Sequence, residues 1–226
     1  MADFVMYGEG PGPGEEYLIP MFSAPLLHLK VDNWKEKKKA LLDIYTERSK
    51  NKKVFKTAVE REIGYDVETD YHYNHDNHTD PESSGYDGKI EEILGDELEG
   101  VCEAFQCAIA VNTSWFEKAR KGAKHEVHNH GVEGLSAVCF VDFNPKYHVP
   151  TIFCNPLLAD AMTTNFIPPN IDEGSLLVFP SYILHFTQSN LSDVDRLILS
   201  FNMQVDHGCF SFEDENNEQC EYQGAL

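Results

Sequence analysis

The second half of the chain predicts an all-β sandwich or jelly roll, and the first half predicts helices that cover one of its sheets. From Val111 onward, short apolar runs alternate with turn signals such as Asn144-Pro145 and Glu173-Gly174. Several short strands separated by such signals are typical of sandwiches and jelly rolls. The strands are expected at 111–119, 124–130, 135–143, 150–154, 175–180, 183–188 and 196–205, with a turn at Lys121-Gly122 between the first two.

The chain before this region predicts a strand and then a helix. Residues 21–31 (MFSAPLLHLKV) have the composition of a strand that is broken near Pro25. Asp32 or Asn33 can cap a helix that runs to about residue 49. Apolar residues recur there at helical spacing, namely Trp34, Leu41, Leu42 and Tyr45.

A loop and a second helix complete the first half. The stretch 62–88 is polar and acidic, and it predicts a long solvated loop. A second helix is expected over 89–110, and Gly95 and Gly100 could interrupt it. The inner apolar stripe of this helix is formed by Leu94, Leu98, Val101 and Phe105.

The length of 226 residues fits one sizeable domain with appended segments. We expect a single domain over 21–205, in which 33–110 supply helical support and 111–205 form the β core. Residues 1–20 are expected to be a flexible lead-in, and residues 206–226 an acidic tail.

Composition excludes several classes of function. The formal net charge of −20 disfavours nucleic acid as a partner, because binding to it depends on neutralising phosphates. The sequence contains no run of about 18 apolar residues, so no membrane span is predicted. The first 14 residues lack the basic and apolar regions of a signal peptide, so we expect a cytoplasmic protein. The six cysteines form no C-x-x-C pair and are expected to be reduced thiols.

The strongest chemical signal is a pair of histidines together with a third histidine further along the chain. His128 and His130 are two residues apart, so on a strand their side chains point the same way. His185 ends an apolar stretch that also reads as strand. Three neutral imidazoles that converge in a β domain would make a transition-metal site. His125 lies one residue off this face and is expected to face solvent.

Arg196 indicates an anionic ligand. It is the only arginine after Arg120, and it opens an apolar strand. A guanidinium that points inward from such a strand needs an anionic partner. Two parallel N–H groups suit a carboxylate, which either the chain or a bound acid could supply. Ser200, four residues on and on the same strand face, could add a hydroxyl.

These residues occur in a familiar order. The segments that carry the resemblance are Asn112 to Phe116, Arg120 to Gly122, His128 to His130, Leu135 to Val138, Glu173 to Ser181, His185, Asn190 to Asp193 and Arg196 to Asn202. Together they resemble a 2-oxoglutarate/Fe(II)-dependent oxygenase family of bacteria and tailed bacteriophages, over about residues 110–205.

The resemblance implies a double-stranded β-helix, which is a cupin-like jelly roll, and a ligand set for Fe(II). His128 and His185 would be iron ligands, and His130 falls where the wider superfamily usually has Asp or Glu. Either His130 completes a three-histidine site, which we favour, or Glu126 is the carboxylate ligand. Gly131, Ala137 and Phe140 also depart from the family pattern, in which Pro, Gly and Tyr are expected.

The resemblance also implies an activity. Arg196 would bind the distal carboxylate of 2-oxoglutarate, with Ser200 and Asn112 as further co-substrate residues. The expected reaction uses O2, hydroxylates a peptide side chain or small molecule, and releases succinate and CO2. If a phage encodes the chain, its location would be the host cytoplasm. The alternatives are a three-histidine cupin-like metal enzyme that does not use 2-oxoglutarate, and a non-catalytic jelly-roll interaction module.

Overall fold

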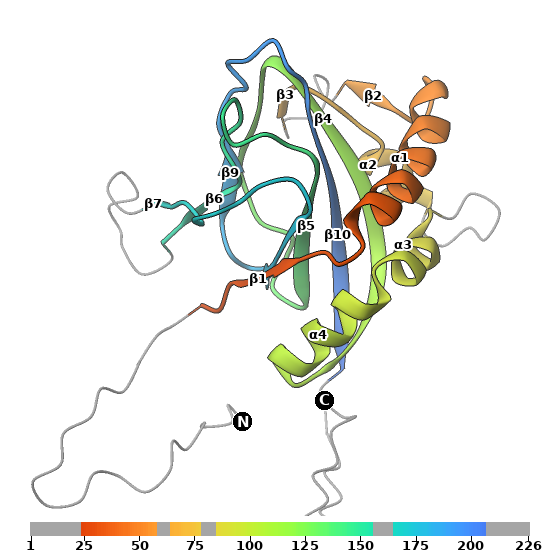
Figure 1. Cartoon of the computed structure of the whole chain (residues 1–226), viewed down its shortest axis with the longest axis vertical. Helices are drawn as coiled ribbons and strands as arrows, with labels where there is room; N and C mark the ends of the chain where they lie inside the picture. The colour runs from red at the N-terminus through yellow and green to blue at the C-terminus, as the bar shows by residue number, and fades with distance from the viewer. Residues whose placement is uncertain (1–23, 58–63, 78–84, 156–164, 207–226) are drawn as a thin grey trace, which may run out of the picture.

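The computed structural model describes residues 24–57, 64–77, 85–155 and 165–206, and its centre is a curled antiparallel sheet (Figure 1). The lead-in predicted at 1–20 and the tail predicted at 206–226, apart from Asp206, lie outside the described residues. One part of the sheet has the order β1 (Leu27–Lys30), β8 (Ser175–Pro180), β5 (Leu135–Asp142), β10 (Arg196–Asp206) and β4 (Ala108–His128). Beyond β4 the order continues with β9 (His185–Thr187), β6 (Ile152–Cys154) and β7 (Asn165–Phe166).

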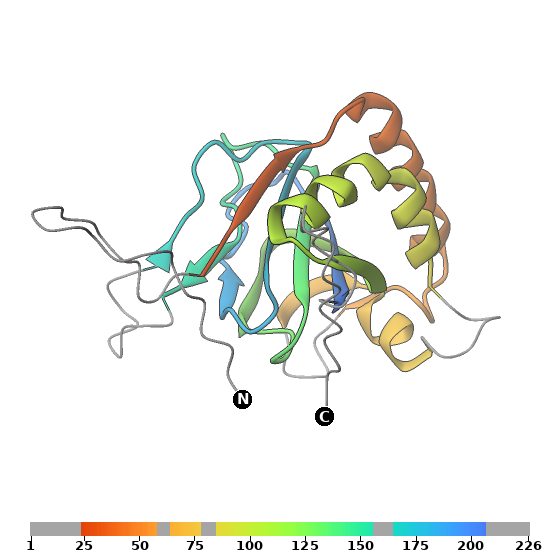
Figure 2. The same cartoon turned by 90° about the horizontal axis from the view of Figure 1, so that it is seen from below.

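The curled sheet confirms the mainly β jelly roll that the strand pattern predicts. Figure 2 shows how the strands wrap around an interior, with β9 and β6 facing the part of the sheet that holds β5. β4 belongs to both parts, because its first half pairs with β10 and its last residues pair with β9. The predicted strands at 135–143, 150–154, 175–180, 183–188 and 196–205 are all present within one or two residues of their expected ends.

Alternate side chains of the central strands serve two separate cores. Leu199 and Cys139 belong to a core that lies under the helices, whereas Ile198 and Val138 belong to a core inside the barrel. This alternation follows from the period of two along a strand. Strands that are buried on both faces read as continuous apolar runs, which is why the sequence of β8 (SLLVFP) has no polar stripe.

Helices cover the outer face of the sheet, as the first half of the sequence predicts (Figure 2). They are α1 (Trp34–Lys50), α3 (Asp87–Ile93) and α4 (Gly95–Phe105). The predicted stripe of the second helix is confirmed, since Leu94, Leu98 and Val101 are buried. This helix divides at Leu94 into α3 and α4, and Gly100 does not interrupt it. It also ends earlier than residue 110, because β4 begins at Ala108.

Two boundary predictions in the first half are wrong in detail. Asn33 occupies the cap position of α1, but its φ of 50° is left-handed and its side chain makes no capping hydrogen bond. Within the described residues, the first strand is limited to Leu27–Lys30 rather than reaching Val31.

The turn predicted at Lys121-Gly122 is wrong, because the strands expected at 111–119 and 124–130 are one continuous strand, β4. The register with the neighbouring strand β3 (Gly64–Thr69) passes from Ala119–Val67 to Lys124–Tyr65. The residues between Ala119 and Lys124 therefore form a bulge rather than a reversal of the chain. Gly122 has a φ of +89°, which favours glycine, and its N–H donates to the carbonyl oxygen of Asn190.

The stretch 62–88 is not a simple loop in its described part. It contains β3, which pairs with β4 and with the short strand β2 (Lys56–Thr57), and then the helix α2 (Tyr71–Asn77). A buried carboxylate, Asp70, joins these elements and accepts a hydrogen bond from the backbone N–H of Phe116 at 2.9 Å. Polar residues that are buried in this way give no apolar periodicity from which strand or helix could be predicted.

Two predictions from composition can be compared directly with the described part of the chain. Cys102, Cys107, Cys139 and Cys154, the four cysteines within it, are all free. In the same part of the chain, no helix is both long enough and apolar enough to cross a membrane.

Candidate metal centre

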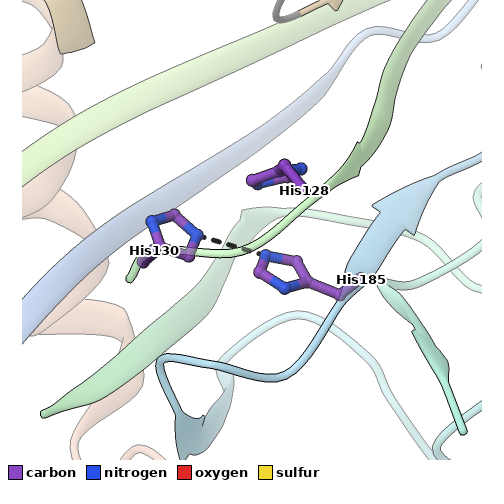
Figure 3. Close-up of side chains that lie close together, drawn as sticks. All are labelled: His128, His130 and His185. Atoms are coloured by element: carbon purple, nitrogen blue, oxygen red, sulfur yellow. Dashed lines mark hydrogen bonds between the residues drawn. The ribbon is translucent and has the colours of Figure 1, made fainter. Parts of the chain in front are cut away.

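Three histidine side chains converge, two from the neighbouring strands β4 and β9 and one from the residues just after β4 (Figure 3). His128 ends β4, His185 opens β9, and the two are partners in the antiparallel register. His130 follows β4 and is held in place by its backbone N–H, which donates to the carbonyl oxygen of Ser181 at 2.9 Å. One ligand atom from each histidine lies within 4.8 Å of the other two. The structure thus brings together the three residues that the sequence singles out.

One pair of nitrogen atoms in the cluster has the spacing of two ligands on one metal ion. Nε2 of His130 lies 3.2 Å from Nε2 of His185. Imidazole nitrogens bind metals such as zinc at about 2.1 Å, so two ligands at a right angle would be about 3 Å apart. The two nitrogens are therefore already close to the separation that a metal ion requires.

Backbone carbonyl groups fix the protons of two of the rings. Nδ1 of His128 donates to the carbonyl oxygen of Glu126 at 2.8 Å, and Nδ1 of His185 donates to that of Ile183 at 2.9 Å. Because a carbonyl oxygen only accepts, each Nδ1 carries the proton and each Nε2 keeps its lone pair. This is the usual way in which a second hydrogen bond orients a metal-binding histidine.

Burial keeps all three imidazoles neutral. Burial first, and then the charges of neighbouring histidines, lower the pKa of His128 to about 3, that of His130 to about 2 and that of His185 to about 4. Metal ions compete with protons for imidazole nitrogen, so groups that are neutral at pH 7 are ready to bind.

Aromatic side chains pack against each ligand. The ring of Trp115 lies 5.4 Å from that of His130 and is tilted by 31°. Phe179 makes an edge contact with His185 at 4.8 Å. The His125 ring is stacked on His128 at 3.9 Å with an angle of 13°. These contacts restrict the rotation of the three ligand rings.

His125 does not face solvent, so that prediction is wrong. The register between β4 and β9 moves from His125–Thr187 to His128–His185, which means that β4 has one extra residue there. The resulting bulge changes which side chains share a face, and the rule of alternation fails between these positions. Only 12% of the His125 side chain is exposed.

Glu126, the alternative ligand, lies apart from the three histidines. Its carboxylate pairs with Lys124 at 2.6 Å, and 45% of its side chain is exposed. It does not belong to the group of atoms that converge within 4.8 Å.

A buried carboxylate that sequence reasoning missed, Glu117, lies beside the centre instead. Its two oxygen atoms lie 2.9 and 3.1 Å from Nδ1 of His125. Burial alone would raise the pKa of Glu117, but the charge and hydrogen bond of His125 lower it to about 2. Burial lowers the pKa of His125, and the Glu117 carboxylate raises it by more. A signal was present, because Trp115, Glu117 and Ala119 alternate along one face of the strand.

Arg196 is a buried cation on the barrel side of β10. Its exposed fraction is 3%, and Nη1 donates to the carbonyl oxygen of Val149 at 3.0 Å. Among the described residues, no carboxylate lies within the 4.0 Å of an ion pair with it. Burial lowers the pKa of Arg196, and the charge of Glu117 opposes this effect.

The two other predicted co-substrate residues differ in position. Ser200 is buried on the same face of β10 as Arg196 and Ile198. Asn112 is exposed and is skipped by the register of β4 with β10, which passes from Thr113 to Val111. The structure therefore does not bring Asn112 to the site.

A pocket of about 240 Å³ opens beside the histidines. One wall comes from β4 and the residues after it, and it contains Trp115, Glu117, His125, His128, Asn129 and His130. The other wall comes from β3 and α2, and it contains Val67, Thr69, Tyr71 and His72. Arg196 lines a separate pocket of about 90 Å³.

Comparison with known proteins agrees with this geometry. Residues 113–202 match the model of a protein family described as "Putative 2OG-Fe(II) oxygenase". No curated protein sequence matches the chain. The matched residues include the three histidines, Arg196 and Ser200, but not the β3 and α2 wall of the pocket.

Solved structures share the fold at low sequence identity. A Pseudomonas putida prolyl-4-hydroxylase is 14% identical, with coverage of 80% of this chain and 93% of that chain and a TM-score of 0.52. The non-haem α-ketoglutarate-dependent epimerase SnoN from nogalamycin biosynthesis is 11% identical, with coverage of 79% and 77% and a TM-score of 0.60. A Trichoplax adhaerens prolyl hydroxylase, in complex with a hypoxia inducible factor peptide fragment, is 11% identical, with coverage of 79% and 83% and a TM-score of 0.54.

The fold and the histidine cluster define a double-stranded β-helix protein with a candidate metal centre. The barrel of this chain, over residues 113–202, is similar to the 2OG-Fe(II) oxygenase family, and its fold is the one that the solved oxygenase structures share.

Proposed function

We propose that the protein is a non-haem Fe(II)- and 2-oxoglutarate-dependent dioxygenase that hydroxylates a peptide side chain or a small molecule. The observation that carries this proposal is Arg196, a buried guanidinium without a carboxylate partner among the described residues. It lies on the barrel side of β10, which pairs with β4, the strand that ends at His128. A buried cation of this kind is costly unless an anion meets it. The dicarboxylate 2-oxoglutarate would supply one carboxylate for Arg196 and another for the metal.

Each group has a distinct part in the reaction. His128, His130 and His185 would hold Fe(II), and their set of neutral nitrogen donors fits that metal. Arg196 would bind the distal carboxylate of 2-oxoglutarate through paired N–H groups, and Ser200 would add a hydroxyl. Phe140, Phe179 and Ile198 line the barrel interior and exclude water from it. When bound, Fe(II) supplies the activation of O2 that couples decarboxylation to oxidation of a C–H bond.

The overall reaction balances as a dioxygenation. One oxygen atom of O2 enters succinate and the other enters the hydroxylated product, while C1 of 2-oxoglutarate leaves as CO2. The protein supplies orientation and a dry site, and the metal and co-substrate supply the chemistry. A peptide substrate is supported by the Trichoplax adhaerens structure, which holds a peptide fragment.

The decisive experiment is the binding of 2-oxoglutarate to the Mn(II)-loaded protein, measured by titration calorimetry. We expect the Arg196→Ala variant to lose affinity for 2-oxoglutarate by about 30-fold or more, because removing one partner of a buried charge pair costs at least about 2 kcal/mol. Arg120→Ala is the matched control, since Arg120 is 58% exposed and pairs with Glu68. Succinate formation under Fe(II) and O2 should follow the same order among the variants.

The three-histidine ligand set also favours a second candidate, a cupin-like metal enzyme that does not use 2-oxoglutarate. This candidate predicts that Arg196→Ala binds the metal and keeps full activity. It also predicts that 2-oxoglutarate produces no heat of binding with the parent protein. Equal 2-oxoglutarate affinity in the parent and Arg196→Ala would remove the basis for the dioxygenase proposal.

A further inference from the structure

Glu117 and His125 form a buried pair in the wall of the metal pocket, and the reaction described above gives them no part. The Glu117 side chain is 8% exposed, and Nδ1 of His125 lies 2.9 and 3.1 Å from its two carboxylate oxygens. The backbone N–H of His125 donates to Oγ1 of Thr187, so β9 also fixes this residue. A buried carboxylate and imidazole that are held in this way have a defined orientation.

The pair touches the centre through a ligand ring. His125 is stacked face to face on His128, with ring centroids 3.9 Å apart. His128 is also fixed by its hydrogen bond to the carbonyl oxygen of Glu126. A chain of contacts thus runs from the Glu117 carboxylate through His125 to a metal ligand.

One atom of this pair indicates that a ligand binds in the pocket. Nε2 of His125 is buried and has no hydrogen-bond partner in the part of the chain that the structure describes. A buried polar atom that is left unpaired costs about 1–3 kcal/mol, so such atoms usually have a role. The ring that carries this atom lines the same pocket as His128 and His130. An oxygen ligand that binds beside His128 would therefore lie near Nε2 of His125.

The charge of the centre gives the pair a second role. Three neutral histidines leave the full positive charge of a divalent ion in a buried place, where charge is costly without compensation. Glu117 is the only acidic residue among the described residues that line the pocket. Its pKa of about 2 keeps it ionised throughout the physiological range.

We propose that Glu117 and His125 are positioning residues of the metal centre. Glu117 supplies a negative charge beside the three neutral ligands and, through its contact with His125, fixes the ring that is stacked on His128. By holding Nδ1 of His125, it also leaves Nε2 of that ring to hydrogen-bond an oxygen donor bound at the metal. This inference rests on the metal-binding part of the proposed function and is independent of 2-oxoglutarate.

The first test is a Co(II) titration of the protein, followed by visible absorption and by calorimetry. We expect Glu117→Gln to weaken Co(II) affinity by about 10–100-fold, which is the usual effect of removing a partner just outside the ligands. Glu97→Gln is the matched control, because Glu97 is a buried carboxylate that pairs with Lys37 at 2.7 Å away from this pocket. The control should keep the affinity and the Co(II) spectrum of the parent.

The second test uses acetate as a simple oxygen donor. His125→Phe keeps an aromatic ring against His128 but removes both nitrogens, so acetate should perturb the Co(II) spectrum of this variant only at about tenfold or more higher concentration than in the parent. The double variant of Glu117→Gln and His125→Phe should bind Co(II) no more weakly than the weaker single variant, because the two residues act as one unit.

The outcomes separate the two proposals. A parent protein that binds no Co(II) would contradict the proposed function itself. A parent that binds Co(II), with variants that match it in affinity, spectrum and acetate response, would overturn only the role of Glu117 and His125. The His125→Phe comparison stands by itself if Glu117→Gln does not fold, and circular dichroism establishes folding for each variant.

Discussion

His130 is the residue whose identity has the largest chemical consequence. It lies where the wider superfamily usually has a carboxylate, and its Nε2 is 3.2 Å from that of His185. A neutral imidazole at this position leaves one more unit of positive charge on the metal than a carboxylate does.

We expect His130→Ala to lose bound metal and His130→Asp to retain it. The alanine variant leaves two nitrogen ligands, whereas aspartate restores a donor of the usual type at the same position. Metal content after dialysis, measured by mass spectrometry against the parent, checks this prediction. If His130→Ala keeps a full equivalent of metal, a different third ligand is present, and Glu126→Ala in that background would then show whether it is Glu126.

At the level of single residues, the sequence predicts those site residues whose relative positions follow directly from their spacing. His128, His130 and His185 were found because an H-x-H pair on a strand and a later strand histidine have a direct geometric meaning. His125 was missed because a single extra residue in β4 decides which side chains share the pocket face, whereas the alternation of Trp115, Glu117 and Ala119 could have indicated Glu117. The residue types near His125 do not predict that bulge.

Among the helices and strands, those in the described part of 62–88 matter most for the pocket beside the histidines. β3 and α2 supply Val67, Thr69, Tyr71 and His72 to the pocket wall. These residues lie outside the part of the chain that matches the oxygenase family. We therefore expect the specificity for the substrate to depend on this wall, whereas the metal chemistry depends on the barrel.

Asp70 is the group that fixes these elements to the sheet. Its carboxylate accepts hydrogen bonds from the backbone of Phe116 and from Tyr86, Asn74 and Arg48. Burial raises the pKa of Asp70, while the bond to Phe116 and the Arg48 charge oppose that effect. Four separate elements thus meet at one buried carboxylate.

We expect Asp70→Ala to lower the free energy of unfolding by about 3–5 kcal/mol, because it leaves the Arg48 guanidinium without its buried partner. Asp193→Ala is the control, since Asp193 is 89% exposed and pairs with an exposed lysine. Such surface pairs contribute about 1 kcal/mol or less. Urea denaturation of both variants gives the comparison, and equal losses would show that the Asp70 network does not stabilise the fold.

The polar character of this network explains why the element prediction failed here. Helices and strands are predicted from apolar periodicity, and β3 and α2 are instead held by a buried acid and its hydrogen-bond donors. The strands of the barrel, by contrast, have continuous apolar runs such as SLLVFP, and their positions were predicted closely.

Over the whole molecule, both cores share the same strands. β5, β8 and β10 send alternate side chains to the core under the helices and to the barrel interior. We therefore expect the described residues to unfold as one cooperative unit, as the single-domain prediction requires. The overall architecture was predictable because it depends on many weak signals that agree.

The net charge of −20 is also a property of the whole chain. From His125 to the end there are only two basic residues besides histidine, and one of them, Arg196, is buried. The part of the chain from His125 onward therefore has almost no cation to offer a polyanion. We expect the fluorescence anisotropy of a labelled DNA duplex to stay flat up to about 100 µM protein in moderate salt. A saturable rise that disappears at higher salt would contradict this expectation.

The pairing of His128 with His185 has a consequence for how the protein matures. These ligands are neighbours only after β4 and β9 have joined across the 56 residues that lie between them in the sequence. Contacts of such long range form late and slowly during folding. A metal ion therefore has no assembled site to bind on the nascent chain, and the two cores must drive the collapse without it. We expect metal loading to be the last event in the maturation of this protein.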